Sequence, residues 1–483
     1  MVFASTIERI TMIEWWIGLS MELRLTSIVV FGLLITPVIN WAIYNAAYFP
    51  LPISPWNRKR FREVVRNHFE ELQPQSASKV GEQKKKVQLE KSKVKSGQPG
   101  SSSQLVVSEA TILNPPMTSR IPIVGWLRLT HEVAVFGNRF WLRPMLIEFL
   151  FPLFLAWLYY YELTGGLLPP LAWPLVPKLQ ESLHVQFISH AVLCCFMVVA
   201  TFIDFDERTI PDWVTIPGTI CGLLMTTLFS HYAPVHLWTS AVDGVTKSWP
   251  TILDWTSPFQ AFNSFSSFQQ LVISMMCFAI WCFAIADRRV RLRRGWRKAI
   301  LFFFAGLVRR PTWKLTLSIL LLGELLIAVG WSFLPFESWR ACMTSLIGMT
   351  IGGVLVWAVR VVATTAIGVE ALGFGDVTLM FMVGAFLGWQ PTWIAFFLAP
   401  MVAICFVIVL YLITGDNQLP FGPYLCVGTL LTLLGWDAFW NVRMQTMIAV
   451  IGFEMLVLLV MGLLLMGLML WGWRAVKSKL LIS

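Results

Sequence analysis

Residues 372–392 read LGFGDVTLMFMVGAFLGWQPT, and they place one carboxylate, Asp376, between two apolar runs. Because such runs are typical of membrane helices, we expect Asp376 to lie at the end of one. A charge there costs several kcal/mol unless a partner offsets it, which favours a functional role. The alternative is a helix N-terminus, since Asp is a favoured capping residue and the glycines before it suit a tight turn.

The composition indicates a polytopic membrane protein. Of the 483 residues, 57% are hydrophobic and 13% are charged, against roughly 25% charged in a soluble domain. We predict an all-α fold with about eleven transmembrane helices, judged against a bilayer core about 30 Å thick. The apolar stretches lie at 24–46, 146–163, 184–203, 213–230, 268–286, 315–335, 342–366, 377–392, 394–413, 421–436 and 446–472.

The distribution of charge orients the chain. Residues 47–143 hold 16 Lys and Arg and 7 Asp and Glu, a net charge of +9 (16 − 7) out of the +10 of the whole chain. The positive-inside rule therefore predicts that this loop is cytoplasmic. Threading eleven spans places the basic runs 288–298 and 474–479 on the same side. Because these runs flank spans, anionic lipid headgroups explain them better than nucleic acid, and we predict no nucleic-acid partner.

A second group of carboxylates, Asp204, Asp206 and Asp212, follows the third apolar stretch. The threading places Asp204 and Asp376 at the same cytoplasmic depth, although they are 172 residues apart (376 − 204). Two facing carboxylates cannot both ionise easily, so one keeps a proton and the pair holds an acid and a base. Such a pair can activate water for attack on a peptide carbonyl. Asp206, as a solvated loop charge, and Asp212, as a helix cap, remain competitors for the first role.

Several blocks of the chain resemble the type IV prepilin peptidases, which are membrane aspartyl proteases of the G-x-G-D kind. The blocks are 203–217 (IDFDERTIPDWVTIP), 370–389 (EALGFGDVTLMFMVGAFLGW) and 419–425 (LPFGPYL), with looser similarity at 121–127 (IPIVGWL) and 143–148 (RPMLIE). The resemblance implies that Asp204 and Asp376 are the catalytic pair. It implies supporting or substrate-binding roles for Gly373, Gly375, Glu148 and Asp212, the glycines by letting the backbone approach the substrate. For Glu148, interaction with a helix dipole is the alternative.

The chain also departs from this family. The family commonly carries paired C-x-x-C motifs in its first cytoplasmic loop, but residues 47–143 contain no cysteine, so we predict no metal site. Thr378 stands where the family usually has Lys, which removes a cation near Asp376. Family members often also methylate the new amino terminus from S-adenosylmethionine, and the missing cysteine motifs put that second activity in doubt.

The predicted organisation has five parts. They are residues 1–46, with the first span; the cytoplasmic loop 47–143, with a disordered basic linker at 70–119; the membrane segment 144–231, with Asp204; an insertion, 232–340, with two extra spans; and the membrane segment 341–483, with the GxGD motif. Within the insertion, the stretch 231–267 is rich in Trp, Phe and Ser and is expected to form an interfacial loop.

The resemblance implies an aspartic-type endopeptidase of the bacterial inner membrane. Its active site would face the cytoplasm and cleave the leader of prepilin-like or pseudopilin proteins, with the lipid bilayer as its other partner. One rival is a different intramembrane GxGD protease, which would not account for the block at 419–425. The other is a membrane subunit of a secretion or pilus machine that keeps the fold without the chemistry.

Overall fold

The computed structural model describes residues 14–49, 121–128, 140–229, 235–242, 245–259, 262, 264–286, 313–414, 420–452 and 454–480. The predicted linker 70–119, most of the loop 47–143 and the basic run 288–298 lie outside these residues, so the predictions made for them stay predictions.

The described residues form mostly helices. These are α2 (Met21–Asn45), α5 (Val124–Arg128), α7 (Leu142–Leu163), the 3₁₀ helix η3 (Pro170–Leu175), α8 (Val176–Glu207), α9 (Asp212–Leu228), α10 (Ser267–Ile285), α12 (Trp313–Phe333), α13 (Phe336–Ile367), α14 (Phe374–Leu387), α15 (Trp389–Thr414), α16 (Gly422–Leu434), the π-helix η6 (Asp437–Met444), α17 (Gln445–Ile451) and α18 (Glu454–Leu480).

The number of spans is lower than predicted. Eight of the described helices are long and apolar enough to cross a membrane, or nine if α16 and η6, which meet at 75°, count as one span. All eleven predicted stretches overlap helices, but α9, α14 and α16 have only 17, 14 and 13 residues. One reason lies at Gly388, whose φ of 80° ends α14 and divides the predicted stretch 377–392.

The prediction of an all-α fold with an interfacial loop at 231–267 misses a β-hairpin. Strands β1 (Val235–Val242) and β2 (Val245–Ile252) pair antiparallel, from Val235 opposite Ile252 to Val242 opposite Val245. The sequence carries two signals for it: both segments are rich in Val, Thr and Trp, and Asp243-Gly244 stands between them. Asp-Gly is among the most favoured pairs in two-residue hairpin turns.

The chain divides into two compact units. The smaller one, Gly18–Trp157, contains α2, α5 and the first part of α7. Here α2 approaches α7 closely, since a methyl group added at Gly32 would lie 2.8 Å from Cβ of Pro152. Small residues often permit such approach between membrane helices. Near α5, Trp126 is buried, whereas Ile121 and Leu127 are exposed.

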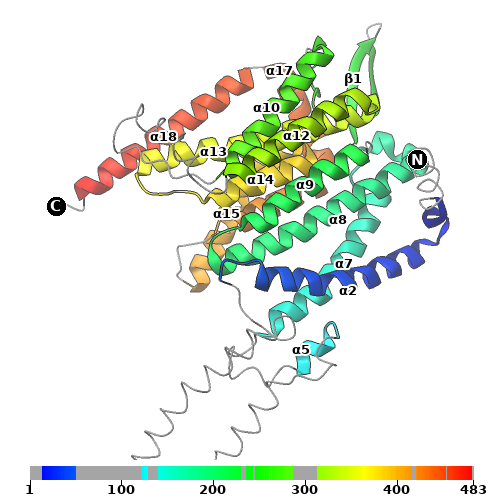
Figure 1. The fold of residues 1–483 in the computed structure, drawn as a ribbon, viewed down its shortest axis with the longest axis horizontal. Helices are drawn as coiled ribbons and strands as arrows, with labels where there is room; N and C mark the ends of the chain where they lie inside the picture. The colour runs from blue at the N-terminus through cyan, green and yellow to red at the C-terminus, as the bar shows by residue number, and fades with distance from the viewer. Residues whose placement is uncertain are drawn as a thin grey trace, which may run out of the picture. The chain divides into compact units, whose positions relative to one another are not determined.

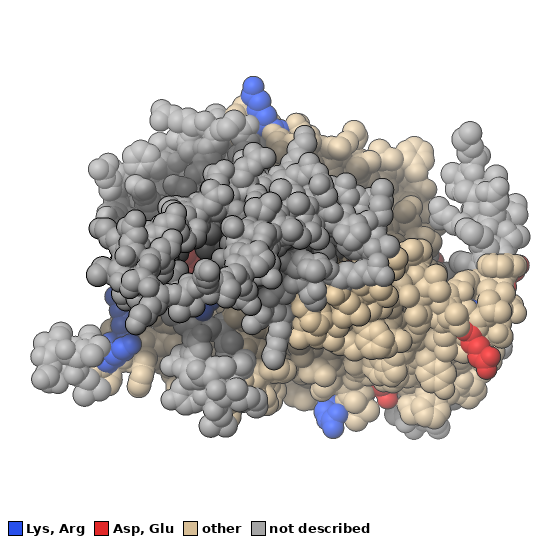
Figure 2. Space-filling view, turned by 90° about the horizontal axis from the view of Figure 1, so that it is seen from below, with Lys and Arg blue, Asp and Glu red and all other residues tan. Residues whose placement is uncertain are grey.

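The larger unit comprises Met1–Ile17 and Leu158–Ser483 and contains the other elements. Its helix α14 lies among α13, α9, α15, α16 and α8 (Figure 1). Every residue from Asp376 to Leu387 is buried. The contact with α13 is close, because a methyl group at Gly384 would overlap the Gly348 carbonyl group. In the view of Figure 2, few charged side chains interrupt the described surface, as expected of a membrane protein.

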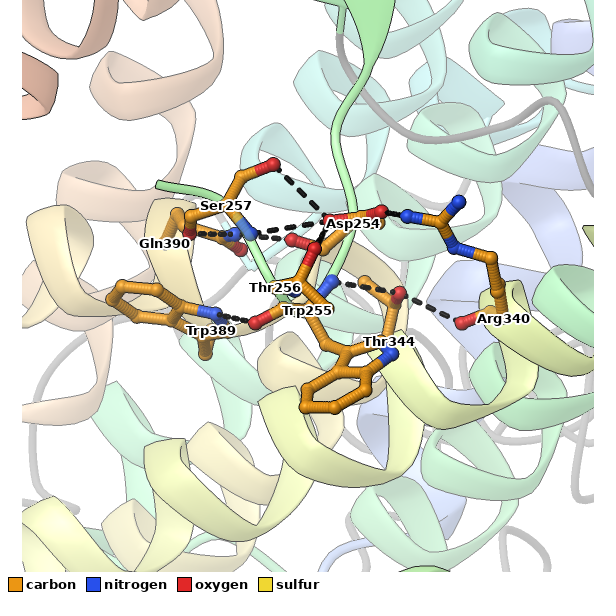
Figure 3. Close-up of polar contacts among 8 residues, drawn as sticks. All are labelled: Asp254, Trp255, Thr256, Ser257, Arg340, Thr344, Trp389 and Gln390. Atoms are coloured by element: carbon orange, nitrogen blue, oxygen red, sulfur yellow. Dashed lines mark hydrogen bonds and ion pairs between the residues drawn. The ribbon is translucent and has the colours of Figure 1, made fainter. Parts of the chain in front are cut away.

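The loop after the hairpin is fastened to α13 and α15 by polar contacts (Figure 3). Asp254 pairs with Arg340 in the first turns of α13, and the Trp255 N–H donates to Thr344 Oγ1 over 3.2 Å. From the start of α15, Gln390 Nε2 donates to the Asp254 and Ser257 carbonyls over 2.6 and 3.0 Å. These contacts fix one end of the predicted insertion on the two helices that flank α14.

Candidate functional site

Asp204 is buried in the last turn of α8, with 4% of its surface exposed. The end of a helix carries partial negative charge, so this is an unfavourable place for a carboxylate. The amino terminus of α16 offsets this, because the Gly422 N–H donates to Asp204 Oδ2 over 3.0 Å. Free N–H groups at a helix start are natural anion partners. Residues 218 positions apart in the chain therefore hold this carboxylate in place.

Asp376 is the third residue of α14 and is 6% exposed. Gly373 is the N-cap, and its N–H donates to the Asp376 carboxylate. A carboxylate in the first turn that reaches back to the N-cap is half of a capping box. The helix-terminus interpretation of Asp376 is therefore confirmed as a description of its geometry. It does not account for the carboxylate that Asp376 faces.

Asp204 and Asp376 come together in the larger unit. Their negative charges act on each other, and both also act on the thiol of Cys426 in α16. Helices α8, α14 and α16 pack on one another, in agreement with this proximity. Among the residues that the structure describes, neither carboxylate forms an ion pair with a Lys, Arg or His side chain. Two buried carboxylates without a paired cation favour the state in which they share a single proton.

Ile210, in the turn between α8 and α9, joins the segments that carry the two carboxylates. It is buried, and a methyl group at Gly375 would lie 2.9 Å from its backbone nitrogen. A methyl group at Gly422 would lie 2.7 Å from Ile210 Cδ1 and 2.5 Å from Asp204 Oδ2. At Gly373 the nearest atom, Asp376 Oδ2, would be 3.5 Å away, an ordinary contact. The Ile210 backbone therefore requires glycine at 375, a methyl group at 422 would displace the Asp204 carboxylate, and Gly373 leaves room beside Asp376.

The competitors for the role of Asp204 differ from it in burial. Asp206 is exposed near the end of α8, and Asp212 is exposed at the first position of α9. Asp212 occupies the first turn of its helix, where a carboxylate is stabilised by the helix dipole. Burial therefore distinguishes Asp204 from both neighbours.

Glu148 belongs to the smaller unit and is buried in α7. Its Oε1 accepts a hydrogen bond from Asn40 Nδ2 over 3.1 Å, and its Oε2 accepts one from the Ile123 N–H over 2.7 Å. Ile123 has a φ of 65°, which is rare for a β-branched residue. Glu148 thus links α2, α7 and the segment before α5 within its own unit, a role that differs from the predicted interaction with a helix dipole.

The position expected to lack a cation, Thr378, is buried, and its Oγ1 donates to the Gly375 carbonyl over 3.0 Å. A positive charge reaches Asp376 from another helix instead, because Arg360 of α13 acts on it electrostatically. Sequence reasoning missed both Arg360 and Gly422. Gly422 lies in the LPFGPYL block that carries the resemblance, whereas Arg360 offers only one signal, a lone charge within an apolar run.

The described residues contain no group of three or more His, Cys, Asp or Glu side chains that could hold a metal ion. The site itself offers two carboxylates in apolar surroundings. With one proton between them, one can accept a proton from water while the other donates a proton to a carbonyl oxygen.

Comparison with known proteins gives a partial match, which includes the segment around Asp376. The sequence profile of the Type IV leader peptidase family matches residues 311–408, a range that includes α13, α14 and Asp376. The prepilin leader peptidase/N-methyltransferase of Aeromonas salmonicida (strain A449) is 32% identical over 107 residues, which are 22% of this chain and 37% of that protein. Its counterpart from Pseudomonas aeruginosa is 34% identical over 104 residues, 21% of this chain and 36% of that protein.

The leader peptidase HopD of Salmonella typhimurium is 39% identical over 75 residues, 15% of this chain and 47% of that protein. The chain thus matches less than half the length of each of these relatives, and no solved structure matches it significantly. Residues 311–408, which carry the Gly-Phe-Gly-Asp turn and its carboxylate, are similar to the Type IV leader peptidase family.

Proposed function

We propose that this chain is a membrane aspartyl endopeptidase that removes the leader of prepilin-like or pseudopilin proteins, with Asp204 and Asp376 as its catalytic pair. One observation carries the proposal: two buried carboxylates from distant helices act on each other with no ion-paired cation among the described residues, and one of them lies in the segment that matches the family. The lipid bilayer is the second partner, since the helices around the pair are apolar.

The proposed reaction needs two carboxylates, one proton and one water molecule. The ionised carboxylate takes a proton from the water, whose oxygen attacks the scissile carbonyl carbon, while the protonated carboxyl donates its proton to the carbonyl oxygen. Collapse of the resulting diol breaks the C–N bond, and the amine leaves with a proton returned by a carboxyl group. The N–H groups of Gly422 and Gly373 would hold the two side chains in position during this exchange.

The test is cleavage of a prepilin by the purified full-length protein in detergent. Asp204→Asn and Asp376→Asn should each lower the cleavage rate at least about 10²- to 10⁴-fold, because each removes a group that transfers a proton. The matched controls are Asp206→Asn and Asp212→Asn, which make the same change at exposed carboxylates nearby. If Asp204→Asn cleaves normally and either control does not, the pair is wrongly assigned.

We further propose that the pair faces the cytoplasm of a bacterium from its inner membrane. The proposal rests on the threading of all eleven predicted stretches, each of which overlaps a described helix, because this threading places the basic stretches on one side. Reporter fusions at Ser103 and Gly295 should report the cytoplasm, whereas a fusion at Ser248 in β2 should report the opposite side. A cytoplasmic signal at Ser248 would contradict the two-span insertion. Methyl transfer from S-adenosylmethionine stays a prediction of the resemblance, and incubation with labelled S-adenosylmethionine and cleaved pilin would test it.

A further inference from the structure

Arg360 lies two turns before the end of α13, beside the connection that leads into α14. Its Nε donates to the Leu372 carbonyl over 2.9 Å. Its Nη2 contacts the Glu370 carboxylate, and its Cζ lies 5.5 Å from the centre of the Phe374 ring. One guanidinium therefore touches three places along the five residues that precede Gly375 and Asp376.

These contacts differ in strength. The Glu370 side chain is 63% exposed, and ion pairs with such exposed groups are worth about 0–1 kcal/mol. Arg360 is 25% exposed, and its hydrogen bond to Leu372 and its stacking on Phe374 do not depend on Glu370. Guanidinium suits this task because it is planar and can donate along its edge while its face rests on a ring. A lysine at this position would keep the charge but lose that geometry.

Arg360 also supplies positive charge to the candidate site. The charged side chains that act on Asp376 are Asp204, which repels it, and Arg360, which attracts it. Helix α14 itself contains no Lys or Arg, and Thr378 is turned to the Gly375 carbonyl. The same connection meets a second cation, because a methyl group at Gly368 would overlap the Arg474 guanidinium. Arg474 is not among the charges that act on Asp376.

We propose that Arg360 is a positioning residue of the active site, which holds the turn before Gly375 and sets both the place and the charge balance of the Asp376 carboxylate. The inference rests on the proposed peptidase function. It adds a residue from α13 to a pair that α8 and α14 supply. Arg360 does not contact the substrate in this proposal but acts through the Leu372–Phe374 backbone and through its field at Asp376.

The first experiment compares four variants of the full-length protein in prepilin cleavage. Arg360→Met should lower kcat about 10- to 100-fold with KM nearly unchanged, because misplacing a catalytic group by about 1 Å costs up to 10²-fold. Arg360→Lys should recover part of that loss by restoring the charge. Glu370→Gln removes only the weak ion pair, and Arg474→Met removes the cation that does not act on Asp376. Both should stay within about twofold of the wild type.

The second experiment is hydrogen–deuterium exchange of the peptide that spans residues 368–376. The Ala371 N–H donates to Thr364 Oγ1 over 3.3 Å, so its exchange reports whether the connection keeps its place. Arg360→Met should speed exchange in this peptide and leave α15 unchanged, and Glu370→Gln should leave both unchanged. This measurement needs no substrate. If the wild type cleaved no prepilin, the proposed function would fail. The exchange data would still test whether Arg360 holds the connection between α13 and α14 in place.

Three outcomes would overturn the inference. Unchanged exchange and unchanged kcat in Arg360→Met would show that the contacts hold nothing in place. Faster exchange with an unchanged kcat would show that Arg360 holds the connection in place but does not position Asp376 for catalysis. Arg360→Met could also lose activity only in proportion to its loss of folded protein, with no recovery in Arg360→Lys. That result would mean a purely structural role for Arg360 and would likewise overturn the inference.

Discussion

Aspartates lie toward both ends of the packed helices α13 and α14, Asp254 at one end and the pair Asp204 and Asp376 at the other, and their surroundings differ. At one end, Asp254 Oδ1 accepts four hydrogen bonds, from the N–H and hydroxyl groups of Thr256 and Ser257, over 2.7–3.1 Å. Its Oδ2 pairs with Arg340 (Figure 3). At the other end, Asp204 and Asp376 each accept a hydrogen bond from one backbone N–H, and their negative charges act on each other.

The difference separates a structural carboxylate from one suited to chemistry. Asp254 has its hydrogen-bonding capacity filled and its charge matched, so a proton or a water molecule gains little by approaching it. Asp204 and Asp376 are more deeply buried, and each adds to the cost of ionising the other. Acidic residues alone would not distinguish the two ends. The two ends differ in the number of hydrogen-bond donors to each carboxylate and in the sign of the nearest charge.

The largest expected effect is on stability at the Asp254 end. Asp254→Asn should lower the free energy of unfolding by about 1.5–3 kcal/mol, because it leaves Arg340 without its charged partner. Asp204→Asn, the matched substitution at the other end, should leave stability unchanged or raise it, since it removes a repelling charge. Unfolding of the purified variants in SDS, followed by tryptophan fluorescence, measures both. Equal losses in the two variants would erase the distinction.

The next effect concerns the helix pair that connects the two ends. Gly384→Ala should destabilise the protein by about 1–3 kcal/mol, because the added methyl group meets the Gly348 backbone, which cannot rotate away as a side chain can. Gly462→Ala in α18 is the matched control, since a methyl group there has no atom within 4 Å. The same unfolding assay applies. A tolerated Gly384→Ala would show that α13 and α14 are not in firm contact.

A smaller effect should appear in cleavage alone. Gly422→Ala should lower the rate about tenfold, because its methyl group displaces the Asp204 carboxylate, and small misplacements of catalytic groups are costly. Gly373→Ala serves as the control, with only an ordinary contact to Asp376. Steady-state cleavage of a prepilin distinguishes them. If Gly373→Ala proved the more damaging, the space beside Asp376 would be needed for the substrate, as the resemblance implies.

The smallest expected effect is that of a metal chelator. A strong zinc chelator should leave both the unfolding midpoint and the cleavage rate unchanged, because the proposed reaction uses two carboxylates and water. Elemental analysis of the purified protein checks the metal content independently. Stoichiometric zinc, or loss of cleavage with the chelator, would show that His and carboxylate ligands replace the missing thiolates.

Much of the candidate site could be predicted from local patterns. Asp204 and Asp376 were identified because each lies in a distinctive block next to an apolar run, and the structure brings them together. The Asp-Gly pair is a local signal for the β-hairpin, but the Trp, Phe and Ser content of the whole stretch 231–267 favours an interfacial loop, so the prediction misses the hairpin. The predicted span count exceeds the eight or nine candidates among the described residues because α9, α14 and α16 are too short to count as spans by themselves.

The sequence by itself determined the membrane character and the two carboxylates, because apolar run length and the spacing of residues within a motif are local properties of the chain. Only the tertiary structure decided that Gly422 donates to Asp204, that Arg360 faces Asp376, and that Asp254 is saturated. The physical reason is that burial, hydrogen bonding and the sign of the nearest charge depend on which helices pack together. These contacts join residues up to 218 positions apart, a separation that no local pattern encodes.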